Sequence, residues 1–207
     1  DTGYMLEGIY GYDENDATSS KKSEGNYNSL IGSDVNKLKI GVPKEFFGDG
    51  LNDEVKTAVL NAVEYYKKLG CEIVDVSLPS LEYAVSAYYL ISSAEAASNL
   101  SRFDGIKYGL RSGLGEDFND LIKNSCREGF GQEVKRRIML GNYALCSGYY
   151  DAYYKNATRI RTQIRNEYSD IFSKCDVMLT PTAPTTAYKI GEQENDPVKM
   201  YLADIYT

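Results

Sequence analysis

The sequence of 207 residues contains no histidine, which limits the acid–base chemistry that its side chains could perform. Ser-His-Asp and Cys-His nucleophile pairs, His-ligated metal sites and the usual near-neutral proton carrier are all excluded. A chain of this composition that catalyses a reaction by itself must move the proton with a lysine or a carboxylate.

Candidate nucleophiles are present, but none has a recognisable activating partner. Ser92 and Ser93 lie in ISSAEAA, Cys126 lies in NSCREGF, and residues 180–186 contribute threonines. No G-x-S-x-G elbow surrounds any of them. A helical serine flanked by alanines is far more typical of close packing, because activation of a nucleophile needs an adjacent base.

The four cysteines are separated by 55, 20 and 29 positions, so no CxxC redox or zinc pair occurs. No signal peptide is visible, and the sequence therefore favours free thiols in the reducing cytoplasm. The chain begins with Asp1 and ends at Thr207 just after an apolar segment, so we expect it to be a piece of a longer protein.

Two charged positions have the chemistry needed to bind an amino acid. The KRR run at 135–137 follows Gly131, and its three side chains cannot all face one way on a helix. A solvated face is the simpler interpretation, while an inward arginine needs an anionic partner. Asp204 lies in the apolar MYLADIY, where a carboxylate needs a salt bridge or a cationic ligand. Arg137 and Asp204 could bind a carboxylate and an ammonium group, but their spacing alone does not bring them into one site.

The elements that would position these residues follow an α/β pattern. Residues 38–43 and 71–79 read as strands, and an amphipathic stripe at 55–66 between them predicts a helix capped by Asn52 or Asp53 and ended by Gly70. Strand, helix and strand in about forty residues predict a right-handed parallel βαβ unit.

Helical patterns dominate the middle of the chain, at about 80–173, before a third strand at 176–180, a proline-braced loop and a helix restarting at Asp196. The run GYYDAYY has too many tyrosines for one apolar stripe, so some of the rings must face polar partners or a cavity. We expect residues 1–33 to be the end of an upstream core, with helical spacing at 1–10, followed by a polar linker. We expect residues 34–207 to form an α/β segment with this helical excursion.

The charge balance argues against a general affinity for nucleic acid. The chain has 23 Lys and Arg against 30 Asp and Glu, a formal net charge of -7. Any contact with RNA would therefore have to be local.

Three long blocks of the sequence resemble the amidase signature family, and within it the A subunits of glutamyl-tRNA(Gln) amidotransferases. They are AYYLISSAEAASNLSRFDGIKYGLRS, EGFGQEVKRRIMLGNYALCSGYYDAYYKNATRIRT and DVMLTPTAPTTAYKIGE with DPVKMYLADIYT. The resemblance covers essentially the whole chain and implies a mixed β-sheet flanked by helices.

The resemblance also implies a function. In this family such a chain hydrolyses glutamine and passes ammonia to a partner, the B subunit, while a small C subunit braces the pair. The resulting heterotrimeric ligase is cytoplasmic and has no membrane contact. The B subunit uses ATP and Mg²⁺ to amidate mischarged Glu-tRNA(Gln), so this chain itself needs no cofactor or metal.

The resemblance further implies a catalytic lysine and two serines in a Gly- and Ser-rich signature. No such segment occurs in this sequence. We expect these catalytic residues to lie upstream of Asp1, and the chain as given to be inactive alone.

What the resemblance assigns to this chain is a glutamine-binding site. Arg137 matches the position that binds the substrate α-carboxylate, Asp204 the one that binds the α-ammonium group, and Tyr88 a tyrosine that lines the pocket. For Tyr88 a packing role stays equally open, because Tyr89 is adjacent. Two further interpretations remain: a general amidase of the same fold, or a non-catalytic module that docks on partner subunits.

Overall fold

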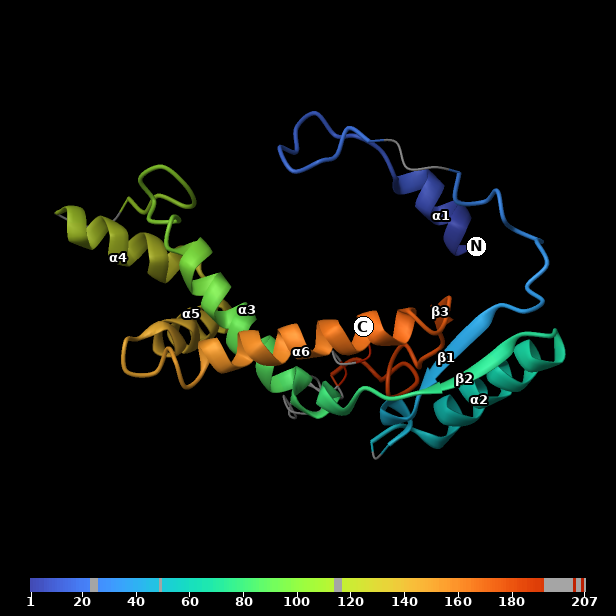
Figure 1. The fold of residues 1–207 in the computed structure, drawn as a ribbon. Helices are drawn as coiled ribbons and strands as arrows, with labels where there is room; N and C mark the ends of the chain where they lie inside the picture. The colour runs from blue at the N-terminus through green and yellow to red at the C-terminus, as the bar shows by residue number, and fades with distance from the viewer. Residues whose placement is uncertain (23–25, 49, 114–116, 192–202, 204–205, 207) are drawn as a thin grey trace.

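The computed structural model describes residues 1–207 except 23–25, 49, 114–116, 192–202, 204–205 and 207. Its elements run in the order α1 (Thr2–Ile9), β1 (Lys39–Pro43), η1 (Lys44–Phe47), α2 (Asp53–Lys68), β2 (Glu72–Val76), η2 (Pro79–Tyr83), α3 (Ala84–Leu100), α4 (Phe118–Gly129), α5 (Gln132–Leu145), α6 (Tyr154–Phe172) and β3 (Val177–Met178). Figure 1 shows the strands and α2 at one end and α3, α4 and α5 toward the other, with α6 running between the two ends.

The predicted βαβ unit is confirmed. Strands β1 and β2 are parallel and pair Ile40 with Ile73, and β3 adds to the other side of β1 in the order β2-β1-β3. The Asn52 side chain caps α2 by accepting a hydrogen bond from the Glu54 amide at 2.8 Å. Gly70 follows the helix with a φ of +91°, a conformation that glycine adopts without strain.

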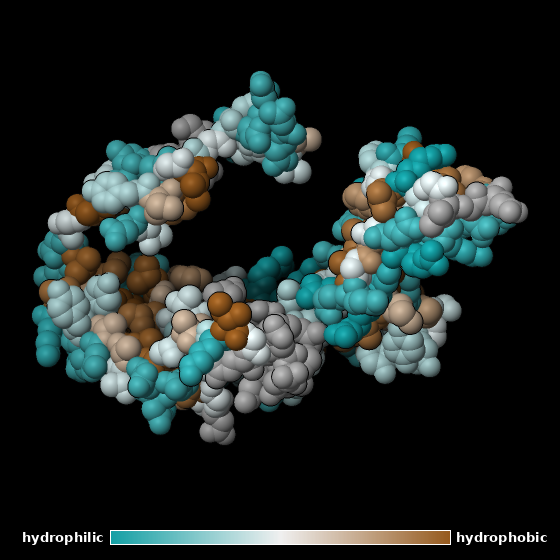
Figure 2. Space-filling view, turned by 180° about the vertical axis from the view of Figure 1, so that it is seen from behind, coloured by the Kyte–Doolittle hydropathy of each residue, from teal (hydrophilic) through white to brown (hydrophobic). Residues whose placement is uncertain are grey.

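The helical region is not continuous. The helical pattern at about 80–173 is divided into α3, α4, α5 and α6, and the tyrosine-rich residues between Leu145, where α5 ends, and Tyr154, where α6 begins, form turns. The predicted helix restart at Asp196 lies outside the described residues. Helix α1 has no buried residue. The molecule as a whole has an open, C-shaped outline (Figure 2).

Helix α6 contributes to both hydrophobic clusters of the described residues. Its Ile171 packs with Phe46, Leu78, Leu81 and Cys175 beside the sheet. Nearer its start, Ala157 packs with Ala87 and Ile91 of α3. Because one rigid helix enters both clusters, it sets the position of α3 relative to the sheet.

Helices α3 and α5 approach each other closely at Gly141. A Cβ atom built on Gly141 would overlap the Ser93 backbone carbonyl and come within 2.7 Å of the Ala97 Cβ atom. Both Ser93 and Ala97 are buried in α3. Glycine is therefore required at this crossing by the space available rather than by its φ angle.

No described helix combines the length and the apolar character needed to span a membrane. The described residues also contain no group of three or more Cys, Asp or Glu side chains placed to hold a metal ion.

Replacing Gly141 with alanine should separate α3 from α5 and lower the free energy of unfolding by about 1–3 kcal/mol, the usual cost of overpacking a core. Urea unfolding followed by circular dichroism measures the change. Gly8→Ala is the matched control, because Gly8 is helical and has open space around its would-be Cβ atom. Equal stability of the Gly141→Ala variant and the unmodified chain would contradict the close crossing.

Candidate functional site

Arg137 lies on α5 with its side chain partly buried. The exposed fraction of its side chain is 36%, against 60% for the neighbouring Arg136. The Nε atom of Arg137 donates to Glu133 Oε1 at 3.3 Å, and Arg136 Nη1 donates to Glu133 Oε2 at 2.9 Å. The two arginines thus share one carboxylate on the preceding turn, and Arg137 is the more enclosed of the two.

Lys135, the first cation of the KRR run, has a separate role. Its Nζ atom donates to the Arg127 carbonyl at 2.7 Å, in the last turn of α4. A cation at a helix C-terminus satisfies free carbonyl groups and interacts favourably with the helix dipole. The three cations therefore do not converge on an anion at the start of α5.

Tyr88 lies on α3, and the exposed fraction of the residue is 47%. Its ring packs edge-on against Tyr89, with 5.1 Å between the ring centroids. Tyr89 is the more buried of the two. This arrangement suits a packing role for Tyr89 and leaves much of the Tyr88 ring accessible.

The fold therefore places Tyr88 and Arg137 on two helices that pack directly against each other through Gly141 and Ser93. Among the described residues, none accepts a hydrogen bond from the two terminal amino groups of Arg137. Asp204, the third predicted site residue, lies outside the described residues. That these three residues form one binding site remains a prediction.

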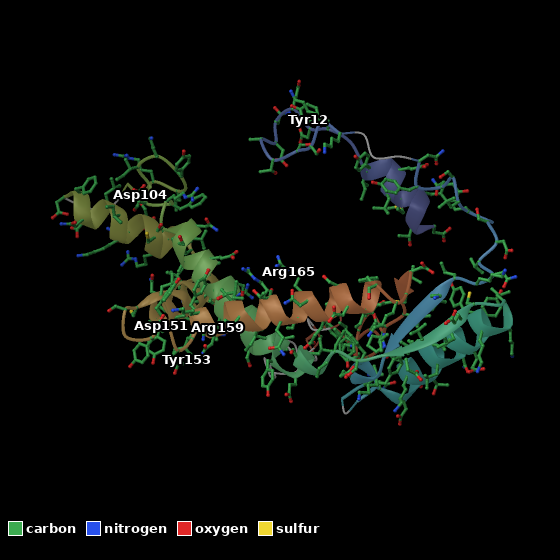
Figure 3. The ribbon with its side chains drawn as sticks, viewed as in Figure 1. Tyr12, Asp104, Asp151, Tyr153, Arg159 and Arg165 are labelled. Carbon is green, nitrogen blue, oxygen red and sulfur yellow. The ribbon has the colours of Figure 1, made fainter. Side chains whose placement is uncertain are left out.

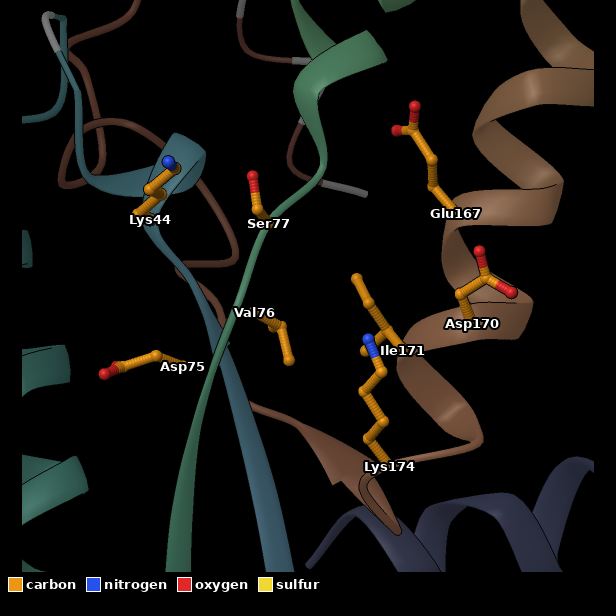
Figure 4. Close-up of a pocket in the computed structure, with 8 residues that line it drawn as sticks. All are labelled: Lys44, Asp75, Val76, Ser77, Glu167, Asp170, Ile171 and Lys174. Carbon is orange, nitrogen blue, oxygen red and sulfur yellow. The ribbon is translucent and has the colours of Figure 1, made fainter.

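A pocket of about 440 Å³, which the sequence did not indicate, lies between the β2 region and the end of α6, and most of the residues that line it are charged (Figure 4). Its charged lining residues are Lys44, Asp75, Glu167, Asp170 and Lys174. These residues come from η1, β2, α6 and the turn after α6, so only the tertiary structure could have revealed the pocket.

Part of this pocket has a clear structural role. Glu167 Oε1 accepts a hydrogen bond from the Ser80 hydroxyl at 2.5 Å, and Oε2 accepts one from the Ser80 amide at 3.2 Å. Because Ser80 lies in η2, directly before α3, this carboxylate anchors the chain that leads into Tyr88.

A second carboxylate beside the pocket, Glu45, accepts a hydrogen bond from the Ser77 hydroxyl. Burial raises the pKa of Glu45, but hydrogen bonds from Ser77 and the Leu78 amide outweigh it and hold the pKa below its usual value. Glu45 therefore stays ionised and serves the β2–η2 connection.

The tyrosine-rich run forms an aromatic cluster at the turn between α5 and α6. Tyr143 stacks on Tyr149 with 4.4 Å between ring centroids, and each ring lies 5.9 Å from that of Tyr153. Figure 3 shows Tyr153 and Asp151 at this end of the helical region. As the sequence suggested for some rings of this run, Tyr149 and Tyr153 have a polar partner, the hydroxyl group of Tyr143.

The sequence matches the Amidase family over residues 1–207. The chain belongs to the amidase family. Its relatives within this family include the A subunits of the glutamyl-tRNA(Gln) amidotransferases of Thermoanaerobacter pseudethanolicus and Brevibacillus brevis, each 54% identical over 207 residues. All of this chain is aligned, and it spans 42% of the length of these relatives.

Solved structures of amidase-family proteins support the same fold. A crystal structure of the A subunit of glutamyl-tRNA(Gln) amidotransferase from Thermotoga maritima matches 99% of this chain and 39% of its own, with 35% identity and a TM-score of 0.67. A bacterial aryl acylamidase of the amidase signature family, 14% identical with a TM-score of 0.62, shares the fold. The predicted fold class, a part of the amidase signature fold, is confirmed.

The tyrosine cluster of this amidase-family chain gives a pH-dependent prediction. The hydrogen bond with Tyr149 is the main cause that raises the pKa of Tyr143 from 10.0 to about 12. A raised phenol pKa means that the folded state holds its proton longer, so this contribution to stability is present below pH 10 and disappears as pH rises toward 12.

Replacing Tyr149 with phenylalanine should return the pKa of Tyr143 toward its ordinary value. The measurement is an alkaline NMR titration with tyrosine labelled at the ring carbon that bears the hydroxyl. Tyr150→Phe is the matched control, because Tyr150 packs on Tyr154 instead. An unchanged Tyr143 titration in the Tyr149 variant would rule out the hydrogen bond as the cause.

Proposed function

We propose that this chain forms the glutamine-binding part of a glutaminase subunit in a tRNA-dependent amidotransferase. The observation that supports this proposal is the environment of Arg137. Its side chain is partly buried, and among the described residues none accepts a hydrogen bond from its two terminal amino groups. Paired N–H groups of this kind are suited to a bidentate carboxylate. Relatives that are 54% identical to the chain carry the name of this subunit.

In the proposed site, Arg137 binds the α-carboxylate of glutamine and Asp204 binds its α-ammonium group. Tyr88 lines the pocket from α3. Substrates without the amino-acid head would leave these charges unpaired, and such a site therefore rejects simple amides. This property distinguishes the proposal from a general amidase.

The chemistry of the proposed reaction belongs to a lysine and two serines outside the given sequence. A lysine held neutral by its surroundings deprotonates the nucleophilic serine through the second serine, and backbone amides stabilise the oxyanion. The serine attacks the side-chain amide, ammonia leaves, and water then releases glutamate.

The proposed complex then uses the ammonia on another polypeptide. The B subunit would activate glutamate mischarged on tRNA(Gln) with ATP and Mg²⁺ and amidate it, while the C subunit braces the pair. No cofactor is assigned to this chain, and the proposal places the complex in the cytoplasm.

Replacing Arg137 with alanine in the full-length protein, in complex with its partners, should lower kcat/KM for glutamine by about 100-fold, because hydrogen bonds to charged groups contribute about 1.5–3 kcal/mol each. Hydrolysis of propionamide, which lacks the amino-acid head, should not fall. Ammonia release measures both reactions.

The control for this variant is Arg159→Ala, which removes an exposed arginine of α6 that bonds only Asn156 among the described residues. Unchanged glutamine kinetics in the Arg137→Ala variant would refute the proposed site. Parallel losses for glutamine and propionamide would indicate general damage instead.

The adjacent Tyr88 and Tyr89 of α3 allow a matched pair of substitutions. Tyr88→Phe should raise the KM for glutamine by about threefold to tenfold, since a neutral hydrogen bond contributes about 0.5–1.5 kcal/mol. Tyr89→Phe should leave this KM unchanged, because Tyr89 is the more buried ring. If Tyr89→Phe alone raises KM, the roles of the two rings are reversed.

A further inference from the structure

We propose that Glu133 is a positioning residue that holds Arg137 in the orientation that binds the substrate carboxylate. This inference rests on the proposed function and adds a residue to it. Glu133 touches no substrate in this arrangement and acts only through Arg137.

The geometry shows which edge of the guanidinium Glu133 uses. Its Oε1 atom accepts from Arg137 Nε at 3.3 Å, while its Oε2 atom accepts from Arg136 Nη1 at 2.9 Å. The two ion pairs span i,i+4 and i,i+3 on one helix. One carboxylate thus engages two successive arginines, with one oxygen for each.

Contact at Nε leaves the opposite end of the guanidinium available. The guanidinium is planar, so fixing its Nε edge also fixes the plane and direction of its two terminal amino groups. These groups form the fork that accepts a carboxylate bidentately. Glu133 therefore orients the fork without occupying it.

The second arginine explains why this carboxylate does not cancel the site's positive charge. Arg136, Arg137 and Glu133 together carry one net positive charge, which a substrate α-carboxylate can still neutralise. Glu133 and Arg137 have side-chain exposed fractions of 47% and 36%, so solvent weakens the Coulomb attraction between them. The effect of Glu133 is then mainly geometric: it restricts the rotamers of a long side chain before the substrate arrives.

The test uses the full-length protein in complex with its partners and measures kcat and KM separately. Glu133→Ala should raise the KM for glutamine by about fivefold to tenfold, the effect of ordering one long side chain on binding, and leave kcat within about twofold. Glu133→Gln retains an acceptor for Arg137 Nε and should recover most of the affinity. Propionamide hydrolysis should not respond to either change.

The matched control is Asp151→Ala, which removes another acidic partner from an i,i+4 pair, with Lys155 Nζ at 3.2 Å. Kinetics with glutamine should be unchanged in this variant. In the double variant Glu133→Ala with Arg137→Ala, the loss should equal that of Arg137→Ala alone, because Glu133 acts through Arg137.

The outcomes separate this inference from the proposed function. If Arg137→Ala leaves glutamine kinetics unchanged, the proposed function itself fails. If Arg137→Ala is impaired while Glu133→Ala has a normal or lower KM, only the positioning role fails, and a lower KM would show that Glu133 competes with the substrate. A loss that is additive in the double variant, or that extends to propionamide, also overturns the positioning role.

Discussion

The close crossing of α3 and α5 is the constraint on which the arrangement of the candidate site depends. Gly141 allows the backbones to approach so closely that any side chain at this position would meet the Ser93 carbonyl. Arg137 lies one turn before Gly141 on α5, and Tyr88 lies about one turn before Ser93 on α3. The distance between the two helices therefore sets how far apart the proposed substrate-binding groups stand, and a small residue sets that distance.

The position of this helix pair relative to the sheet depends on α6 and on the contact of one half-buried carboxylate. Helix α6 places Ile171 in the cluster beside the sheet and Ala157 in the cluster against α3. Glu167, on the same helix, binds both the hydroxyl and the amide of Ser80 just before α3 begins. Apolar packing thus positions α3 relative to the sheet, and the hydrogen bonds to Ser80 fix the residues from which the helix begins.

Electrostatics in this acidic amidase-family chain is organised locally. The net charge is -7, yet α5 carries three successive cations. Lys135 donates to a backbone carbonyl, and Arg136 and Arg137 share one carboxylate. Local pairing keeps such a cluster from repelling itself. It also leaves the terminal amino groups of Arg137 without an acceptor among the described residues, and the proposed glutamine site uses these groups.

Local sequence patterns determined the elements of the fold. The apolar stripe, the Asn52 cap and Gly70 predicted α2 and the parallel βαβ unit, because these signals act within a few residues and do not depend on distant packing. Long matching blocks also identified the family and, by resemblance, the residues proposed to bind glutamine.

Other features were decided only by the tertiary structure. The packing of α3, which carries Tyr88, on α5, which carries Arg137, joins residues that are far apart in the chain, and so does the pocket at Glu167. The sequence pattern also did not mark the local break between α5 and α6. Glu133 and the two arginines that share it are close in sequence. However, many acidic and basic residues lie three or four positions apart on a helix, so this spacing alone does not show which of them form ion pairs. Which pairs form, and which guanidinium edge each acceptor engages, depends on how neighbouring helices enclose each side chain.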